Sequence, residues 1–166
     1  LKHTTATSSW GFIVYGPTGV VPQVRLDALE DVGAGFYIGG GGVRSVVAPS
    51  LCRIGGNVDI SSNALVDLQL PALSEVGGTF TISSNNALTT LDLTGMTSLG
   101  GPTGAGNLSI NSNPLLTSVA LPNLAGSVQY IQLHYNTGLT TIDFRSLEQI
   151  TTAGIPSLSL IHISEP

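Results

Sequence analysis

The sequence predicts an all-β fold, a parallel β-solenoid of five to six turns with 22–23 residues each. An asparagine recurs behind an aliphatic residue at Asn63, Asn85, Asn113 and Asn136, with spacings of 22, 28 and 23 residues. Apolar and small polar residues alternate within each repeat, as in the segments VDI, LQL and LDL, and this is the period of a β-strand. Because no single repeat can bury its apolar face alone, successive repeats are expected to stack as turns of one coil.

Three columns of apolar residues share the period of the asparagines. The first comprises Ile60, Ile82, Ile110 and Leu133, the second Leu70, Leu93, Leu121 and Phe144, and the third Leu73, Leu99, Leu124 and Leu147. The register continues upstream through Ile38, Val46, Ala48 and Leu51, with Gly41 at the asparagine position, and Leu26 and Leu29 match the end of an earlier unit. The interval of 28 residues accommodates residues 100–106 as an inserted surface loop, and residues 1 to about 20 fit the pattern only loosely.

We interpret the recurring asparagines as structural rather than catalytic. The chain must turn a corner after each strand, which leaves backbone N–H and C=O groups without partners in a sheet. An asparagine amide has both donors and an acceptor for such groups, and asparagine tolerates turn conformations. We therefore expect Asn63, Asn85, Asn113 and Asn136 to form a buried ladder, in which loss of one amide costs about 1–3 kcal/mol.

Composition limits the partners of this chain. Its 166 residues have a net charge of −5 and only 9% charged residues, and the five basic residues stand singly. No stripe of Lys and Arg is therefore available to bind the phosphates of a nucleic acid. The single Cys52 excludes an internal disulfide. No apolar run reaches the roughly 20 residues of a membrane-spanning helix, so we expect membrane attachment only through an anchor outside this sequence.

We expect residues 1–156 to form one solenoid domain that is truncated at both ends. The C-terminal segment LSLIHISEP matches a translated adapter of sequencing libraries, and residues 157–166 are assigned to a non-native tail. A truncated solenoid exposes core and strand edges at its ends. Residues 1–156 alone are therefore expected to aggregate.

No pattern in the sequence supports a catalytic, cofactor-binding or metal-binding site. The glycine-rich segments lack the Lys of a phosphate-binding loop, and His134 has no second His or Cys in the corresponding columns. Asp92 and Asp143 share an outward column with Gln69 and Ala120, and the expected separation of about 10 Å lies at the outer edge of the range for glycosidase carboxylates. We interpret Gln69, Asp92 and Asp143 as part of a possible outward, solvated face.

Two further surface features concern sugars. Tyr37, Tyr130 and Tyr135 would be able to stack on a carbohydrate if their columns converge on one face. The sequon Asn-Leu-Ser at Asn107 would be an acceptor for N-glycosylation in a protein secreted by a eukaryote.

The segments LSEVGGTFTISSNNALTTLDL and LPALSEVGG resemble the receptor L-domain family, a leucine-rich-repeat relative built as a right-handed β-helix. The segment VDISSNAL also fits the repeat core L-x-L-x-x-N-x-L. The resemblance extends over residues 24–155 and implies a non-enzymatic domain, extracellular or on the cell surface, that binds ligands or supports a wall. Animal receptor members are rich in disulfides, so the single Cys52 favours a microbial surface protein.

We therefore predict a cell-surface or extracellular repeat domain for ligand recognition or adhesion, with a protein or glycan ligand and no cofactor. A passive structural cell-wall protein is the alternative. A polysaccharide-acting β-helix enzyme is less favoured, because the basic and acidic clusters that such enzymes use are missing from the sequence.

Overall fold

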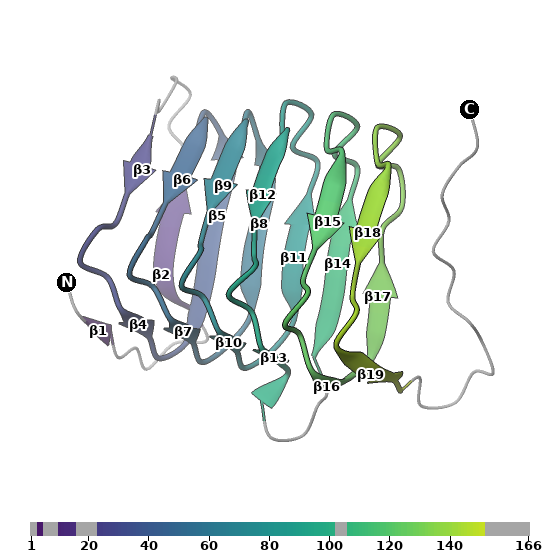
Figure 1. The fold of residues 1–166 in the computed structure, drawn as a ribbon. Helices are drawn as coiled ribbons and strands as arrows, with labels where there is room; N and C mark the ends of the chain where they lie inside the picture. The colour runs from purple at the N-terminus through teal and green to yellow at the C-terminus, as the bar shows by residue number, and fades with distance from the viewer. Residues whose placement is uncertain (1–2, 5–9, 16–22, 102–105, 152–166) are drawn as a thin grey trace.

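The computed structural model describes residues 3–4, 10–15, 23–101 and 106–151. These residues form a parallel β-solenoid of about six turns, and none of them is α-helical (Figure 1). No helix that would be long and apolar enough to cross a membrane occurs in the described ranges. The tail assigned to residues 157–166 lies outside them.

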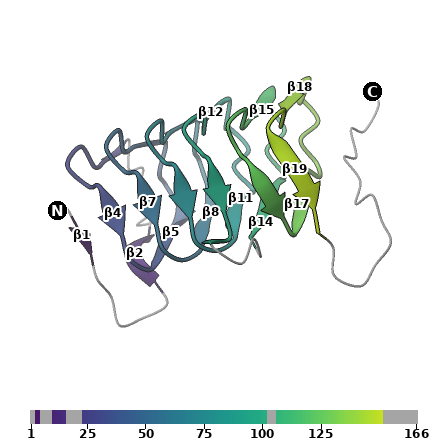
Figure 2. The same ribbon diagram turned by 60° about the horizontal axis from the view of Figure 1, so that its bottom comes forward.

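The strands lie on three faces that run along the solenoid. The long face comprises β2 (Trp10–Tyr15), β5 (Gly35–Gly41), β8 (Val58–Asn63), β11 (Phe80–Ser83), β14 (Asn107–Asn111) and β17 (Tyr130–Gln132). The second face comprises β3 (Val24–Arg25), β6 (Ser45–Val47), β9 (Asp67–Gln69), β12 (Thr90–Asp92), β15 (Ser118–Ala120) and β18 (Thr141–Asp143). The third face comprises β1 (His3–Thr4), β4 (Asp31–Val32), β7 (Arg53–Ile54), β10 (Glu75–Val76), β13 (Ser98–Leu99), β16 (Gly126–Val128) and β19 (Leu147–Ile150), several of which are seen side by side in Figure 2.

The hydrogen-bonded sheet of the long face is continuous, whereas those of the other two faces break after the fourth turn. Ladder pairing stops between β12 and β15 and between β13 and β16. The insertion of residues 100–106 lies at the end of this fourth turn, between β13 and β14. Residues 102–105 of this insertion lie outside the described ranges. On either side of it, β14 pairs with β11 in register, with Ile110 opposite Ile82.

The register predicted from the repeats is confirmed on the long face. Ile38, Ile60, Ile82 and Ile110 are paired in one row, and Gly41 pairs with Asn63 as expected for the asparagine position. Side chains of a strand alternate between its two faces, and the members of this row are all completely buried. The inward residues of all turns form one continuous hydrophobic core.

The prediction for the third apolar column was wrong at Leu99. Met96, not Leu99, is the equivalent of Leu73, because Met96 N–H donates to the carbonyl of Leu93 at 3.0 Å just as Leu73 N–H donates to the carbonyl of Leu70 at 3.1 Å. Leu99 instead pairs with Val76 on the third face. Methionine is apolar and adaptable enough to fill a leucine site, so an alignment on leucines alone misses it.

The repeat pattern also extends further toward the N-terminus than the sequence suggested. In β2, Phe12 pairs with Phe36 and Val14 pairs with Ile38. The rings of Phe12 and Phe36 stack with centroids 4.7 Å apart and planes 10° apart. Residues 10–15 therefore supply the long-face strand of a first turn.

Candidate functional site

The asparagine column forms a hydrogen-bonded row inside the corner that follows the long face. Asn85 and Asn113 are completely buried, and Asn136 is 7% exposed. Asn85 N–H donates to Asn113 Oδ1 at 3.2 Å, and Asn113 N–H donates to Asn136 Oδ1 at 2.9 Å. The side chain of Asn63 lies outside the described part of the structure.

Each amide of this row also bonds to backbone carbonyls of two turns. Asn85 Nδ2 donates to the carbonyl of Ile60 in the preceding turn at 3.0 Å and to that of Ser83 in its own turn at 3.1 Å. Asn136 Nδ2 makes the corresponding bond to the carbonyl of Ile110 at 2.6 Å. With their polar groups occupied inside the fold, these amides are placed to hold corners together and not to contact a ligand.

The residues proposed as an outward face lie together on the second face. Gln69 pairs with Asp92, and Ala120 pairs with Asp143. The strand that carries Ala120 lies between those that carry the two aspartates. The two carboxylates are therefore not on neighbouring strands.

Both of these carboxylates bond to residues two positions further along the chain. Asp92 Oδ1 accepts hydrogen bonds from the N–H of Thr94 at 3.1 Å and from its hydroxyl at 2.8 Å. Asp143 accepts from the backbone N–H and the guanidinium of Arg145. The hydrogen bond from the Arg145 side chain is the main reason why the pKa of Asp143 is lowered from its usual 3.8. Both aspartates thus stabilise local turns.

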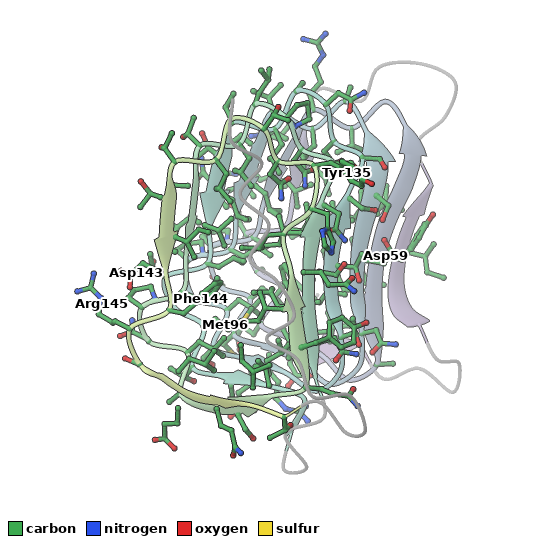
Figure 3. The ribbon with its side chains drawn as sticks, turned by 90° about the vertical axis from the view of Figure 1, so that its right-hand side faces the viewer. Asp59, Met96, Tyr135, Asp143, Phe144 and Arg145 are labelled. Atoms are coloured by element: carbon green, nitrogen blue, oxygen red, sulfur yellow. The ribbon has the colours of Figure 1, made fainter. Side chains whose placement is uncertain are left out.

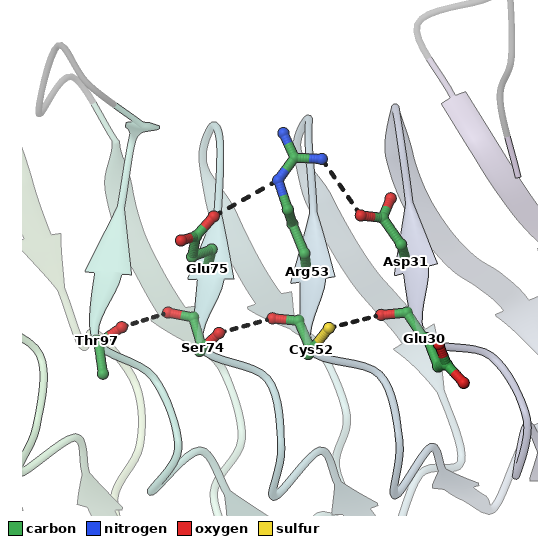
Figure 4. Close-up of polar contacts among 7 residues, drawn as sticks. All are labelled: Glu30, Asp31, Cys52, Arg53, Ser74, Glu75 and Thr97. Carbon is green, nitrogen blue, oxygen red and sulfur yellow. Dashed lines mark hydrogen bonds and ion pairs between the residues drawn. The ribbon is translucent and has the colours of Figure 1, made fainter. Parts of the chain in front are cut away.

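The third face carries a charged row that the sequence analysis did not identify. Arg53 lies between two carboxylates, with Nη1 3.4 Å from Asp31 Oδ2 and Nε 3.5 Å from Glu75 Oε2 (Figure 4). The constant spacing of 22 residues between the three was a signal available in the sequence. Exposed ion pairs of this kind are worth at most about 1 kcal/mol, and here they align three neighbouring turns.

Beside the charged row, short polar side chains connect four consecutive turns. The thiol of Cys52 donates to the carbonyl of Glu30 at 3.1 Å, the hydroxyl of Ser74 to that of Cys52 at 2.9 Å, and the hydroxyl of Thr97 to that of Ser74 at 3.0 Å (Figure 4). Cys52 therefore acts as a structural equivalent of Ser and Thr at this corner.

A groove of about 260 Å³ lies beside this charged row, and it is lined by Arg53, Ile54, Gly55, Glu75, Val76, Gly77, Ser98 and Gly101. The guanidinium of Arg53 is already neutralised by carboxylates on both sides. Ser98 is the only side-chain hydroxyl in this lining, and no histidine is present there to activate it. The eight lining residues therefore contain no pair of a nucleophile and a histidine base.

The outer surface of the long face is broad and mostly polar, with the exposed Ile13 beside Tyr37 at its N-terminal edge. One row of outward residues contains Tyr37, Asp59, Thr81, Ser109 and Gln132, and the next contains Ser61, Ser83, Asn111 and His134. All nine are partly exposed, and Asp59 is the one member with a carboxylate. Six strands about 4.8 Å apart give the face a width of about 24 Å.

Hydrogen bonds within strands and between neighbouring turns order this surface. The hydroxyls of Ser83 and Ser61 are 3.1 Å apart, Asn111 Nδ2 donates to Ser109 Oγ at 2.7 Å, and the N–H of His134 donates to Asn111 Oδ1 at 2.9 Å. Asp59 accepts a hydrogen bond from Ser61. The face is therefore a preorganised array of hydroxyl and amide groups.

The three tyrosines lie at different places along this face. Tyr37 is on β5 and Tyr130 is on β17, four strand spacings or about 19 Å away across the sheet. Tyr135 follows β17 at the corner and is 76% exposed. Figure 3 shows Tyr135 on the same side of the solenoid as Asp59, with Asp143 on the opposite side. The tyrosines share a face, but they do not form one cluster.

The sequon asparagine opens β14 at the edge of the inserted loop. Asn107 is partly exposed, and its Nδ2 atom, the atom that glycosylation modifies, is 3.4 Å from Thr79 Oγ1. Leu108 points into the core, so Asn107 and Ser109 both point outward. A glycan at Asn107 would project from the long face.

Among the described residues, no group of three or more His, Cys, Asp or Glu side chains is arranged to hold a metal ion. Comparisons with protein-family models, curated proteins and solved structures found no match. The interpretation of function therefore depends on the surfaces of the solenoid themselves.

Proposed function

We propose that this protein is a non-enzymatic, cell-surface or extracellular repeat domain of the receptor L-domain type, which recognises a protein or glycan ligand through its long face. The observation that carries the proposal is the contrast between the two sides of this sheet. Inward positions repeat from turn to turn, as in Ile60, Ile82 and Ile110. The outward positions beside them change from Ser61 to His134 along the face.

This contrast is typical of solenoids that bind through a broad surface, because the core fixes the scaffold while outward residues are free to vary. The long face has the features needed for recognition, since it is wide, continuous and ordered by hydrogen bonds between turns. Its hydroxyl and amide groups suit hydrogen bonding to a polar ligand.

The carboxylates on the second face support a binding role over a catalytic one. Asp92 bonds to Thr94, and Asp143 is paired with Arg145. A pair of carboxylates for glycoside hydrolysis needs one group with a raised pKa to act as an acid, whereas the pKa of Asp143 is lowered.

The test is to screen the immobilised protein against glycan and protein arrays and to repeat the screen with two matched variants. Thr81→Arg places a long cation at the centre of the long face, and Thr90→Arg places the same side chain at an exposed position of the second face. We expect Thr81→Arg to weaken binding at least about tenfold, equivalent to roughly 1.4 kcal/mol, and Thr90→Arg to change it less than about twofold.

If Thr90→Arg weakens binding and Thr81→Arg does not, the binding surface is the second face, where Gln69, Asp92 and Asp143 lie. Absence of binding to either array would contradict a recognition role and favour a structural wall protein. Turnover of a polysaccharide that is lost in Asp92→Asn would contradict the non-enzymatic assignment.

A further inference from the structure

Tyr135 is a large aromatic residue held in a left-handed backbone conformation. Its φ angle is 57°, and its side chain is 76% exposed. Ser84 and Ser112 occupy the corresponding corner of the two preceding turns, one residue before the buried asparagine, with φ angles of 58° and 57°. Bulky residues rarely adopt this conformation, and such strained positions are often associated with function when the fold enforces them.

Hydrogen bonds on both sides of Tyr135 fix its backbone. The carbonyl of His134 accepts from the N–H of Ser112 at 2.9 Å. On the other side, the buried Asn136 donates through Nδ2 to the carbonyl of Ile110 at 2.6 Å. The ring is therefore presented from a rigid corner, so a ligand would bind it without first ordering a flexible loop.

The surroundings of Tyr135 are polar. The ring of His134 lies with its centroid 6.3 Å away at an angle of 49°. Within the described residues, neither the imidazole of His134 nor the side-chain amide of Gln132 makes a hydrogen bond. Asn111 and Ser109 follow on the neighbouring strand. The exposed ring of Tyr135 thus lies beside His134, and further groups able to bond to hydroxyls occupy outward positions on β17 and on the neighbouring β14.

We propose that Tyr135 is the stacking platform of a carbohydrate-binding subsite, in which a pyranose ring lies against the phenol ring while His134 and Gln132 hydrogen-bond to its hydroxyls. A pyranose has an apolar C–H face surrounded by hydroxyls, which matches an aromatic ring beside imidazole and amide groups. A protein partner would favour a larger apolar centre. The inference depends on the proposed function, whose ligand it narrows to glycans.

The corner offers a matched variant for testing the subsite. Tyr135→Ser introduces the residue that Ser84 and Ser112 place in the same conformation, so the fold should be retained, which circular dichroism and thermal unfolding will show. Calorimetric titration uses soluble hexasaccharides of β-1,4-glucose, β-1,3-glucose and β-1,4-N-acetylglucosamine as probes. At least one should bind the unmodified protein, Tyr135→Ser should weaken it roughly tenfold, and Tyr135→Phe should stay within about threefold.

Other outcomes would overturn the subsite and separate it from the proposed function. If Tyr135→Ser binds the hexasaccharide as tightly as the unmodified protein, or if Tyr135→Phe loses as much affinity as Tyr135→Ser, the ring is not a stacking platform. Binding to a protein array but to none of the hexasaccharides would contradict the sugar subsite and leave the recognition function intact. Absence of binding to every glycan and protein probe would contradict both.

Discussion

The backbone N–H of Asn85 donates to the side-chain oxygen of Asn113, the equivalent residue of the next turn, at 3.2 Å. Asn113 also donates through Nδ2 to the carbonyl of Ile82 in the preceding turn at 3.3 Å and to that of Asn111 in its own turn at 2.9 Å. One buried side chain therefore connects the backbones of consecutive turns at a corner where the sheets supply no partners.

Asn113→Ala is expected to lower the free energy of unfolding by about 1–3 kcal/mol, because it leaves the buried backbone groups that bond to the amide without a hydrogen-bond partner. Urea or thermal unfolding measures the change. Asn123→Ala is the matched control, since Asn123 is exposed and its side chain makes one hydrogen bond, to the carbonyl of Thr94 at 2.8 Å. Equal effects of the two substitutions would contradict a special role for the buried row.

Gly77→Ala is expected to destabilise the solenoid by about 1–3 kcal/mol through overpacking. A methyl group at this position would overlap the backbone carbonyl oxygen of Gly55, the equivalent residue one turn earlier. Gly39→Ala is the comparison, because its nearest neighbour is the end of the Tyr37 side chain, which can rotate away. In thermal unfolding, the melting temperature of Gly77→Ala should be clearly lower than that of Gly39→Ala. The reverse order would show that the turns can separate to admit a side chain.

The fold was predictable from the sequence because the repeat imposes two independent constraints. Alternation of apolar and polar residues identifies strands, and the spacing of equivalent residues gives the register in which they stack. Ile60, Ile82 and Ile110 meet both constraints, and their pairing agrees with the structure. Met96 escaped the alignment because the core selects apolar volume and not leucine in particular.

The surface was much less predictable than the core. The row of Asp31, Arg53 and Glu75 has the spacing of the repeat, so a search for periodic charges would have found it. Tyr135 is at a position held by Ser112 one turn earlier, but its strained backbone and its exposure are evident only in the folded structure. Outward residues do not share a packing partner from turn to turn. The sequence pattern therefore carries little information about their contacts or their exposure.

Cys52→Ser should leave thermal stability unchanged, because Ser74 and Thr97 make the same type of hydrogen bond to the preceding turn through a hydroxyl. Cys52 is exposed, so the unmodified protein is expected to form disulfide-linked dimers under oxidising conditions. Gel electrophoresis without reductant should show dimers that are lost in Cys52→Ser. A marked loss of stability in this variant would mean that the thiol makes a contribution that a hydroxyl does not replace.

The ion pair between Asp143 and Arg145 is expected to contribute to stability only above acidic pH. The pKa of Asp143 is lowered from its usual 3.8 in the folded protein, mainly by the hydrogen bond from the Arg145 side chain. Because the pKa of Asp143 is lower in the folded than in the unfolded protein, its ionised form stabilises the fold at any pH above the unfolded pKa. This contribution is lost as the pH falls from about 3.8 through the pKa of the folded protein.

Asp143→Asn should therefore flatten the pH dependence of unfolding below about pH 4 and leave its slope unchanged at neutral pH. The effect will be small because Arg145 is largely exposed and Asp143 is partly exposed. An NMR titration of Asp143 in Arg145→Ala provides the direct check, since its pKa should rise toward 3.8. An unchanged pKa in that variant would contradict the assigned cause.

The last turn that the structure describes buries its apolar residues less completely than the turn before it. Ile142 and Phe144 are partly exposed, whereas their equivalents one turn earlier, Val119 and Leu121, are completely buried. Ile150, on β19, is 45% exposed. The last strand of each face also has an edge with no neighbouring strand among the described residues. Apolar surface beside open strand edges favours addition of strands from another molecule.

We therefore expect the protein to self-associate in a concentration-dependent way, which sedimentation velocity will measure, and Ile150→Lys to reduce this association. A charge at a sheet edge opposes strand addition because it would be buried in the contact. Val66→Lys is the matched control, because Val66 is 39% exposed but belongs to an interior turn. If both substitutions reduce association equally, the association is non-specific and does not involve the last turn in particular. A monomer at all concentrations would contradict self-association through the last turn.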